Sequence, residues 1–200
     1  MYIPFISTKP NRLEINREYL QSAFVASISI VLMLIGVYAD QSLFDWHNLV
    51  ITPLQLASLP NLLVAPLLHA STAHLVINCI TIVVVGTLAG SVYPRSTLRA
   101  LPLIWFGSGI AAWLIGKPET QHIGADGMTY GVMFFVGVLG ILRRDSIAIA
   151  ISGIAFCFYT SMIVTLLLHT PNISWQSHVG GAIAGVISGL LIQLINQDIK

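Results

Sequence analysis

The sequence predicts an all-α polytopic membrane protein, and two observations carry this prediction. Apolar residues make up 56% of its 200 residues and charged residues only 8%, which is far from the balance of soluble globular proteins. These apolar residues gather in segments of the length, about 20 residues, that a helix needs to cross a bilayer core. The segments lack the repeated alternation of apolar and polar residues that membrane β-strands show, so helices are the predicted spanning elements.

Six apolar segments define the predicted transmembrane helices. Pro94, Pro118 and Pro171 fall between segments, where a missing backbone donor does least harm. Pro102 falls in the first turn or so of the third segment, where proline is tolerated. The six predicted spans cover residues 22–39, 73–90, 98–116, 126–142, 147–169 and 178–195.

The positive charges predict the orientation of the chain. Of the nine Lys and Arg residues, only Lys117 falls on the side of the membrane opposite to the others. The positive-inside rule assigns the cation-rich side to the cytoplasm, so we expect both termini there. Residues 1–21 then form a cytoplasmic segment, and residues 22–197 form a single transmembrane domain. The short loops favour a bacterial inner membrane.

The longest predicted connection, residues 40–72, lies on the outer side in this topology. It contains Asp40 and Asp45 but no Lys or Arg, and it is rich in leucine and aromatic residues. A solvated loop would be more polar. We therefore expect this connection to lie at the membrane interface or to pack against the helices.

Polar residues stand at the predicted outer ends of spans two, four and six. His74 and Asn78 are one helical turn apart and therefore share a helix face. Asp126, the only carboxylate within a predicted span, opens the fourth span one turn before Tyr130, and His178 opens the sixth. An ionisable residue at membrane depth costs roughly 2.5–3.5 kcal/mol even on the insertion scale, which makes Asp126 a candidate functional residue.

These motifs resemble those of the rhomboid family of intramembrane serine proteases, and the resemblance covers roughly residues 60–195. The family has His-x-x-x-Asn in its second core helix and His-x-x-Gly-x-x-x-Gly in its sixth. Its fourth helix begins Gly-x-Ser-Gly and carries a tyrosine four residues after the serine. The matching residues of this chain are His74, Asn78, Gly124, Gly127, Tyr130, His178, Gly181 and Gly185.

The resemblance implies a six-transmembrane-helix bundle and a role for each matching polar residue. His178 takes the general-base position, and Tyr130 is expected to stack on it. His74 and Asn78 take the positions that bind the oxyanion. Asp126 stands at the nucleophile position, where the family has serine. Gly181, Gly185 and Gly189 form a stripe of small residues that lets another helix approach closely.

The carboxylate at position 126 changes the expected chemistry. A serine nucleophile gives its proton to a neighbouring imidazole, whereas a carboxylate at neutral pH has no proton to give. We expect the Asp126 charge to pair with His178. We also expect its oxygens to occupy the oxyanion pocket formed by His74, Asn78 and the start of the fourth helix. Thr129 lies nearly one turn away, and neither Ser71 nor Ser177 stands on a helix opening like that of position 126.

The sequence therefore predicts a protease-inactive member of this fold that binds transmembrane segments of client proteins within the lipid bilayer. The alternative is an active intramembrane serine-type endopeptidase, particularly if Asp126 is an altered serine. A transporter that uses Asp126 and His178 is a third possibility. No nucleic-acid partner and no cofactor are expected, and His74, Asp126 and His178 are few ligands for a metal. The histidines without a motif, interpreted as interfacial, are His47, His69, His122 and His169.

Overall fold

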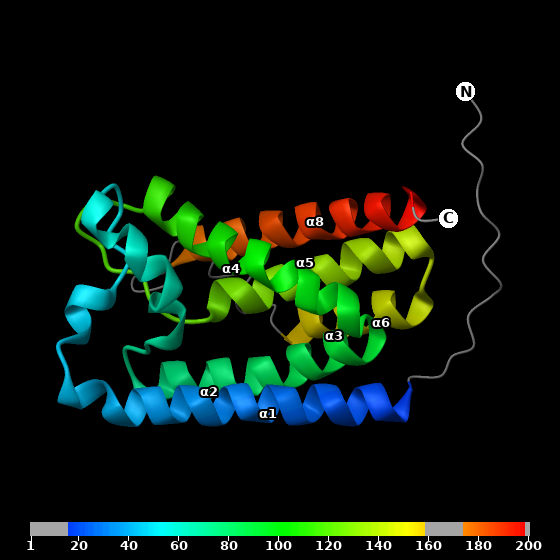
Figure 1. Cartoon of the computed structure of the whole chain (residues 1–200), viewed down its shortest axis with the longest axis horizontal. Coiled ribbons are helices and arrows are strands. Elements are labelled where there is room, and N and C mark those ends of the chain that lie inside the picture. The colour runs from blue at the N-terminus through cyan, green and yellow to red at the C-terminus, as the bar shows by residue number, and fades with distance from the viewer. Residues whose placement is uncertain (1–15, 159–173, 199–200) are drawn as a thin grey trace.

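The computed structural model describes residues 16–158 and 174–198, and in these residues it contains helices and no strand (Figure 1). A connection that contains four 3-10 turns links the first two spans. The helices that build the spans are α1 (Arg17–Asp40), α2 (Thr72–Thr81), the π-helical turn η5 (Ile82–Gly86), α3 (Thr87–Val92), α4 (Pro94–Ile115), α5 (Asp126–Arg143), α6 (Ser146–Phe158) and α8 (Trp175–Asp198). The 3-10 turns are η1 (Gln41–Leu43), η2 (Trp46–Leu49), η3 (Leu56–Leu63) and η4 (Ala65–Leu67).

The all-helical fold class is confirmed. Five helical stretches of the described chain are long and apolar enough to cross a membrane, and α6 is a shorter apolar helix. The predicted span 147–169 begins as α6, and its remainder lies outside the described residues. The five stretches are Arg17–Leu43, Thr72–Val92, Pro94–Ile115, Asp126–Arg143 and Trp175–Ile195.

Helix α4 begins four residues before the predicted start at residue 98. Pro94 takes the first helical position, where its fixed φ suits the helix and its missing N–H is not needed. Pro102 consequently lies inside α4, more than two turns from its start, so its predicted place in the first turn was wrong.

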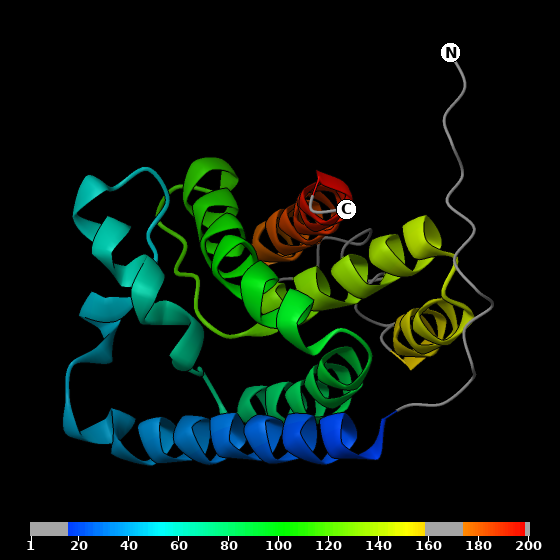
Figure 2. The same cartoon turned by 45° about the vertical axis from the view of Figure 1, so that its right-hand side comes forward.

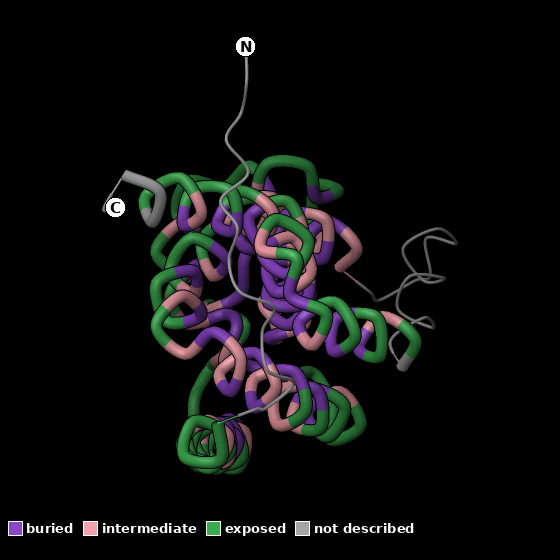
Figure 3. Tube along the Cα trace, turned by 90° about the vertical axis from the view of Figure 1, so that its right-hand side faces the viewer, coloured by how far each residue is buried: buried purple, intermediate pink, exposed green. Residues whose placement is uncertain are grey.

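The helices form two groups that are visible in two views (Figures 1 and 2). In one group, α8 packs against both α4 and α5. In the other, α1 packs along η5 and α3. Contacts of α3 with α4 and of η5 with α5 connect the groups. Buried residues concentrate in the middle of the bundle, and most of the outward surface is exposed (Figure 3).

Glycines allow the backbones of α5 and α8 to touch. A Cβ atom on Gly181 would collide with the carbonyl oxygen of Gly127, and one on Gly185 with the carbonyl oxygen of Gly131. The predicted close approach is therefore confirmed for these two glycines. A Cβ on Gly189 would lie 3.1 Å from the Val138 side chain and 3.5 Å from the carbonyl oxygen of Phe135, which is a looser contact.

The outer connection packs against the bundle. Leu62 and Ala65 are buried with Ala112 of α4. The indole Nε1 of Trp105 in α4 donates a hydrogen bond to the carbonyl oxygen of Leu62 at 2.8 Å. These contacts place η3 and η4 beside α4.

Candidate active site

The carboxylate of Asp126 contacts the second span. Its Oδ2 lies 2.7 Å from Nε2 of His74, which is the distance of a hydrogen-bonded ion pair. The two side chains remain 20% and 26% exposed, respectively. The sequence predicts a pair between Asp126 and His178, but the hydrogen bond that the structure contains is made with His74. The carboxylate thus lies on the side of the site that the resemblance assigns to the oxyanion.

Gly124 allows this contact between α5 and α2. Its φ is +99°, in the left-handed region that glycine adopts without strain. A Cβ atom here would lie 2.6 Å from Cε1 of His74 and 3.3 Å from Oδ2 of Asp126. The N–H of Gly124 donates to the carbonyl oxygen of Ala65 at 3.0 Å, which ties the turn before α5 to the outer connection. The glycine of the motif therefore sets the position of both side chains.

His74 and Asn78 lie one turn apart in α2, and both are engaged. The backbone N–H of His74 donates to the Oγ of Ser71, the N-cap residue. The Nδ2 of Asn78 donates to the carbonyl oxygen of His74 at 3.2 Å. Asn78 is fully buried, and its Oδ1 has no hydrogen-bond partner among the described residues. With Nε2 of His74 bound to Asp126, the site offers one fewer donor to an oxyanion.

His178 is held by ring stacking. Its imidazole lies 4.5 Å from the ring of Tyr130, centroid to centroid, with an interplanar angle of 12°. His178 is 3% exposed, and its Nδ1 has no hydrogen-bond partner in the described part of the chain. A Cβ on Gly127 would lie 2.6 Å from the carbonyl oxygen of Ser177, so the first turns of α5 and α8 are in contact. These contacts place the imidazole beside Tyr130, which lies one turn along α5 from Asp126.

The three hydroxyl groups nearest to the site in sequence have local roles. Ser71 caps α2, as described above. Thr129 donates through Oγ1 to the carbonyl oxygen of Asp126 at 2.7 Å. Ser177 donates through Oγ to the carbonyl oxygen of Ser174 at 2.7 Å. None of the three makes a described hydrogen bond to His178, so none has the contact with a base that activates a nucleophile.

His69 is fully buried, so its interpretation as interfacial was wrong. The side-chain amide of Gln41 pairs with both backbone groups of His69, accepting from its N–H at 3.1 Å and donating to its carbonyl oxygen at 2.9 Å. The ring lies edge-on to that of His74, with 5.1 Å between centroids. Burial, helped by the nearby His74, lowers the pKa of His69 from 6.5 to about 4. His69 therefore supports His74 from the outer connection as a neutral imidazole.

His122 is likewise buried rather than interfacial. Its Nδ1 lies 2.7 Å from Oγ of Ser174, and its Nε2 lies 2.9 Å from Oγ1 of Thr120. Its backbone pairs with that of Ile51 in the outer connection. Burial lowers the pKa of His122, which favours the neutral ring. Because the carbonyl oxygen of Ser174 accepts the N–H of His178, His122 positions the start of α8.

A metal site has no support in this geometry. Among residues 16–158 and 174–198, no group of three or more His, Cys, Asp or Glu side chains is arranged to hold a metal ion. The set of His74, Asp126 and His178 is therefore not gathered around one point. The hydrogen-bonded pair in that set consists of His74 and Asp126.

The fold is that of a polytopic, all-helical membrane protein in the residues that the structure describes. A comparison with protein families matches the Rhomboid domain over residues 57–194. The chain belongs to the rhomboid family.

Mycobacterial proteins are among its relatives. Uncharacterized proteins of Mycobacterium tuberculosis and Mycobacterium bovis are each 33% identical over 150 residues, covering 71% of this chain and 62% of theirs. An uncharacterized protein of Mycobacterium leprae is 32% identical over 135 residues, covering 64% of this chain and 54% of its own length. This chain therefore spans less than two thirds of the length of these relatives.

Proposed function

We propose that this chain is a rhomboid-fold membrane protein that lacks protease activity and binds transmembrane segments of client proteins. The observation that carries the proposal is the 2.7 Å contact between Asp126 Oδ2 and His74 Nε2. It supports the proposal because another side chain engages the carboxylate at the position where the resemblance expects the serine. The same contact occupies the imidazole that the family uses to bind the oxyanion.

The proposed inactivity follows from two changes, one at the nucleophile position and one at the oxyanion position. The nucleophile and its general base act as a unit, and loss of one member of such a unit removes most of the rate enhancement. Loss of one oxyanion donor alone typically costs about 10²–10³ in rate. The hydroxyls of Ser71, Thr129 and Ser177 are bound to local backbone groups, which argues against these three as substitutes beside His178.

The surface around the polar pair supports client binding. His74 and Asp126 keep part of their surface accessible. On α2, within two turns of His74, the side chains of Val76, Ile77 and Ile80 are about half exposed. An apolar helix face beside an accessible polar pair can accept an apolar client helix and hydrogen-bond a polar group within it. By the distribution of cations, this site faces the outer side of a bacterial inner membrane, and the mycobacterial relatives support a bacterial setting.

Protease inactivity is tested with a fluorogenic transmembrane peptide. We expect no cleavage by the unmodified chain and measurable cleavage by Asp126→Ser, because that variant regains a hydroxyl beside His178. Asp126→Ser/His178→Ala serves as the blank. Cleavage by the unmodified chain above this blank would contradict the proposal and support the active-protease alternative.

Client binding is tested by photocross-linking in lipid nanodiscs. A photoreactive residue at Ile77 is expected to capture a labelled single-span peptide, and unlabelled peptide should compete. The same residue at Leu114 of α4, which is equally exposed at 52%, is the matched control. Equal labelling at both positions, or none at Ile77, would contradict client binding at this site.

A further inference from the structure

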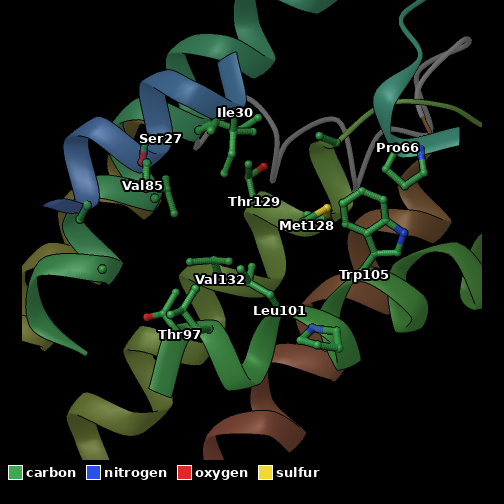
Figure 4. A pocket seen from close by; sticks show the side chains of 18 of the residues that line it. Ser27, Ile30, Pro66, Val85, Thr97, Leu101, Trp105, Met128, Thr129 and Val132 are labelled. Atoms are coloured by element: carbon green, nitrogen blue, oxygen red, sulfur yellow. The ribbon is translucent and has the colours of Figure 1, made fainter. Parts of the chain in front are cut away.

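A cavity of about 680 Å³ lies between the two groups of helices, and the proposed function does not use it. Its walls come from α1, from η5 with α3, from α4 and from α5 (Figure 4). The labelled side chains that face it include Ile30, Val85, Leu101, Trp105 and Val132. Loop residues of the outer connection, among them Pro66, lie along its edge.

Two polar side chains of the lining, Thr97 and Thr129, are hydrogen-bonded within the protein. The hydroxyl of Thr97 donates to the carbonyl oxygen of Ala89 at 3.1 Å. The hydroxyl of Thr129 is bound to the backbone of Asp126. With these groups satisfied within the protein, the walls present mainly hydrocarbon. A half-open apolar cavity between membrane-spanning helices is expected to be filled by another apolar group, because an unfilled void forfeits dispersion contacts.

The volume of the cavity distinguishes between two possible apolar occupants, a client helix and the acyl chain of a lipid. A transmembrane helix is about 10 Å wide and about 30 Å long, which corresponds to roughly 2,400 Å³, several times the volume available. The α1 residues that line the cavity run from Tyr19 to Leu34, a rise of about 22 Å along the helix. One leaflet of the hydrocarbon core is about 15 Å deep. The cavity therefore fits the acyl chain of a lipid better than a client helix.

Cations flank the end of the cavity near the beginning of α1. Pro94 and Leu98 line the cavity, and they are followed directly by Arg95 and Arg99. Arg17 precedes the lining residue Tyr19 by two positions. All three arginine side chains are exposed. Glu18 is the only acidic residue in the first turns of α1 and α4, so the local charge is positive.

We propose that this cavity binds an acyl chain of an anionic glycerophospholipid, whose phosphate is held by Arg17, Arg95 and Arg99. Arginine forms strong charge-assisted hydrogen bonds with phosphate, and each basic residue near an anionic leaflet adds to the attraction. The bound chain fills the space between α1 and α4. It thereby stabilises the group of helices that carries His74 against the group that carries His178.

Phosphatidylglycerol binding to the purified full chain tests the headgroup part of this proposal. Native mass spectrometry in detergent should show retained phosphatidylglycerol in preference to phosphatidylcholine. Each single Arg→Gln change at positions 17, 95 and 99 is expected to weaken phosphatidylglycerol binding by about five-fold, and the triple change by about a hundred-fold. Lys117→Gln, an exposed cation after the other end of α4, is the control and should leave binding unchanged.

A bulky residue in the cavity tests the acyl-chain part. Ala26→Trp places an indole in the cavity from an exposed position of α1, and Val25→Trp is the matched control because Val25 is 63% exposed and does not line it. We expect Ala26→Trp, but not Val25→Trp, to abolish the rise in unfolding temperature caused by phosphatidylglycerol. Unchanged lipid binding in Ala26→Trp, equal retention of both lipids, or displacement of the lipid by a single-span peptide would overturn the proposal. These readouts do not depend on protease inactivity or on client binding at α2.

Discussion

The helices pack closely within each of the two groups but loosely between the groups. Within the α4–α5–α8 group, Gly181 and Gly185 bring the backbone of α8 against that of α5. Within the α1–η5–α3 group, Gly86 and Gly90 bring α3 and η5 against the side chains of α1. Between the groups lies the 680 Å³ cavity. Each group is closely packed, whereas the contact between them is loose.

The polar site is divided along the same boundary. His178 and Tyr130 belong to the α4–α5–α8 group, whereas His74 and Asn78 lie on α2, which packs on α1 and continues into η5. The hydrogen bond between Asp126 and His74 joins the two groups at the site. The comparison teaches that Asp126 also has a structural role, because its hydrogen bond to His74 connects the two loosely joined groups of helices.

The largest expected effect on stability comes from disrupting the backbone contact between α5 and α8. In Gly181→Val, the new Cβ would collide with the carbonyl oxygen of Gly127, which is a backbone atom of α5. We expect a loss of about 3 kcal/mol or more in the free energy of unfolding, at the upper end of overpacking effects. Unfolding in mixed detergent micelles provides the measurement.

The control for this variant is Gly153→Ala in α6. A Cβ atom on Gly153 has nothing within 4 Å. Alanine has the higher helix propensity, so this change should be neutral or should stabilise by up to about 1 kcal/mol. Similar losses in Gly181→Val and Gly153→Ala would contradict the distinction between close and open glycine positions.

A smaller effect is expected at the start of α8. His122→Phe keeps most of the ring volume but removes the hydrogen bonds to Ser174 and Thr120. We expect it to destabilise by about 1–3 kcal/mol because two hydroxyls lose a partner. His47→Phe, at an exposed position, should change stability by less than about 0.5 kcal/mol. If the two variants behave alike, His122 does not hold α8 in place.

The pH dependence of stability tests whether His69, beside α2, is buried as a neutral imidazole. The folded pKa of His69 is about 4 and the ordinary value is 6.5, so the unfolded chain binds a proton here at a higher pH than the folded chain. Stability should therefore fall as the pH is lowered from about 6.5 towards about 4. We expect His69→Phe to remove part of this loss, with His122 contributing to the remainder. Unfolding temperatures measured across this range for both proteins test the point, and identical slopes would contradict it.

The sequence predicts the helices and the motif positions well, for identifiable physical reasons. Apolar runs of spanning length reveal the helices, and residues four apart on a helix share a face. The spacing of His74 and Asn78, and of Gly181 and Gly185, could therefore be read directly. The glycines at these positions also predicted the close approach of α8 to another helix.

The partners of individual side chains could not be predicted in the same way. Asp126 bonds to His74 and not to His178 because of the turn at Gly124, which no local pattern specifies. His69 and His122 have partners 28 and 52 residues away in sequence, in segments without periodicity. Their burial depends on how the outer connection folds over the bundle, and hydropathy alone does not determine that arrangement.

The most direct test of the connection between the two halves is a double-mutant cycle. Asp126→Ala would be combined with His74→Ala and, separately, with His178→Ala, and the free energy of unfolding of every variant measured in one detergent system. We predict a coupling energy of about 1.5–3 kcal/mol between Asp126 and His74, as expected for a hydrogen bond to a charged group. We predict a coupling energy below about 0.5 kcal/mol between Asp126 and His178. A stronger coupling to His178 than to His74 would contradict the claim that Asp126 joins the two groups of helices through His74.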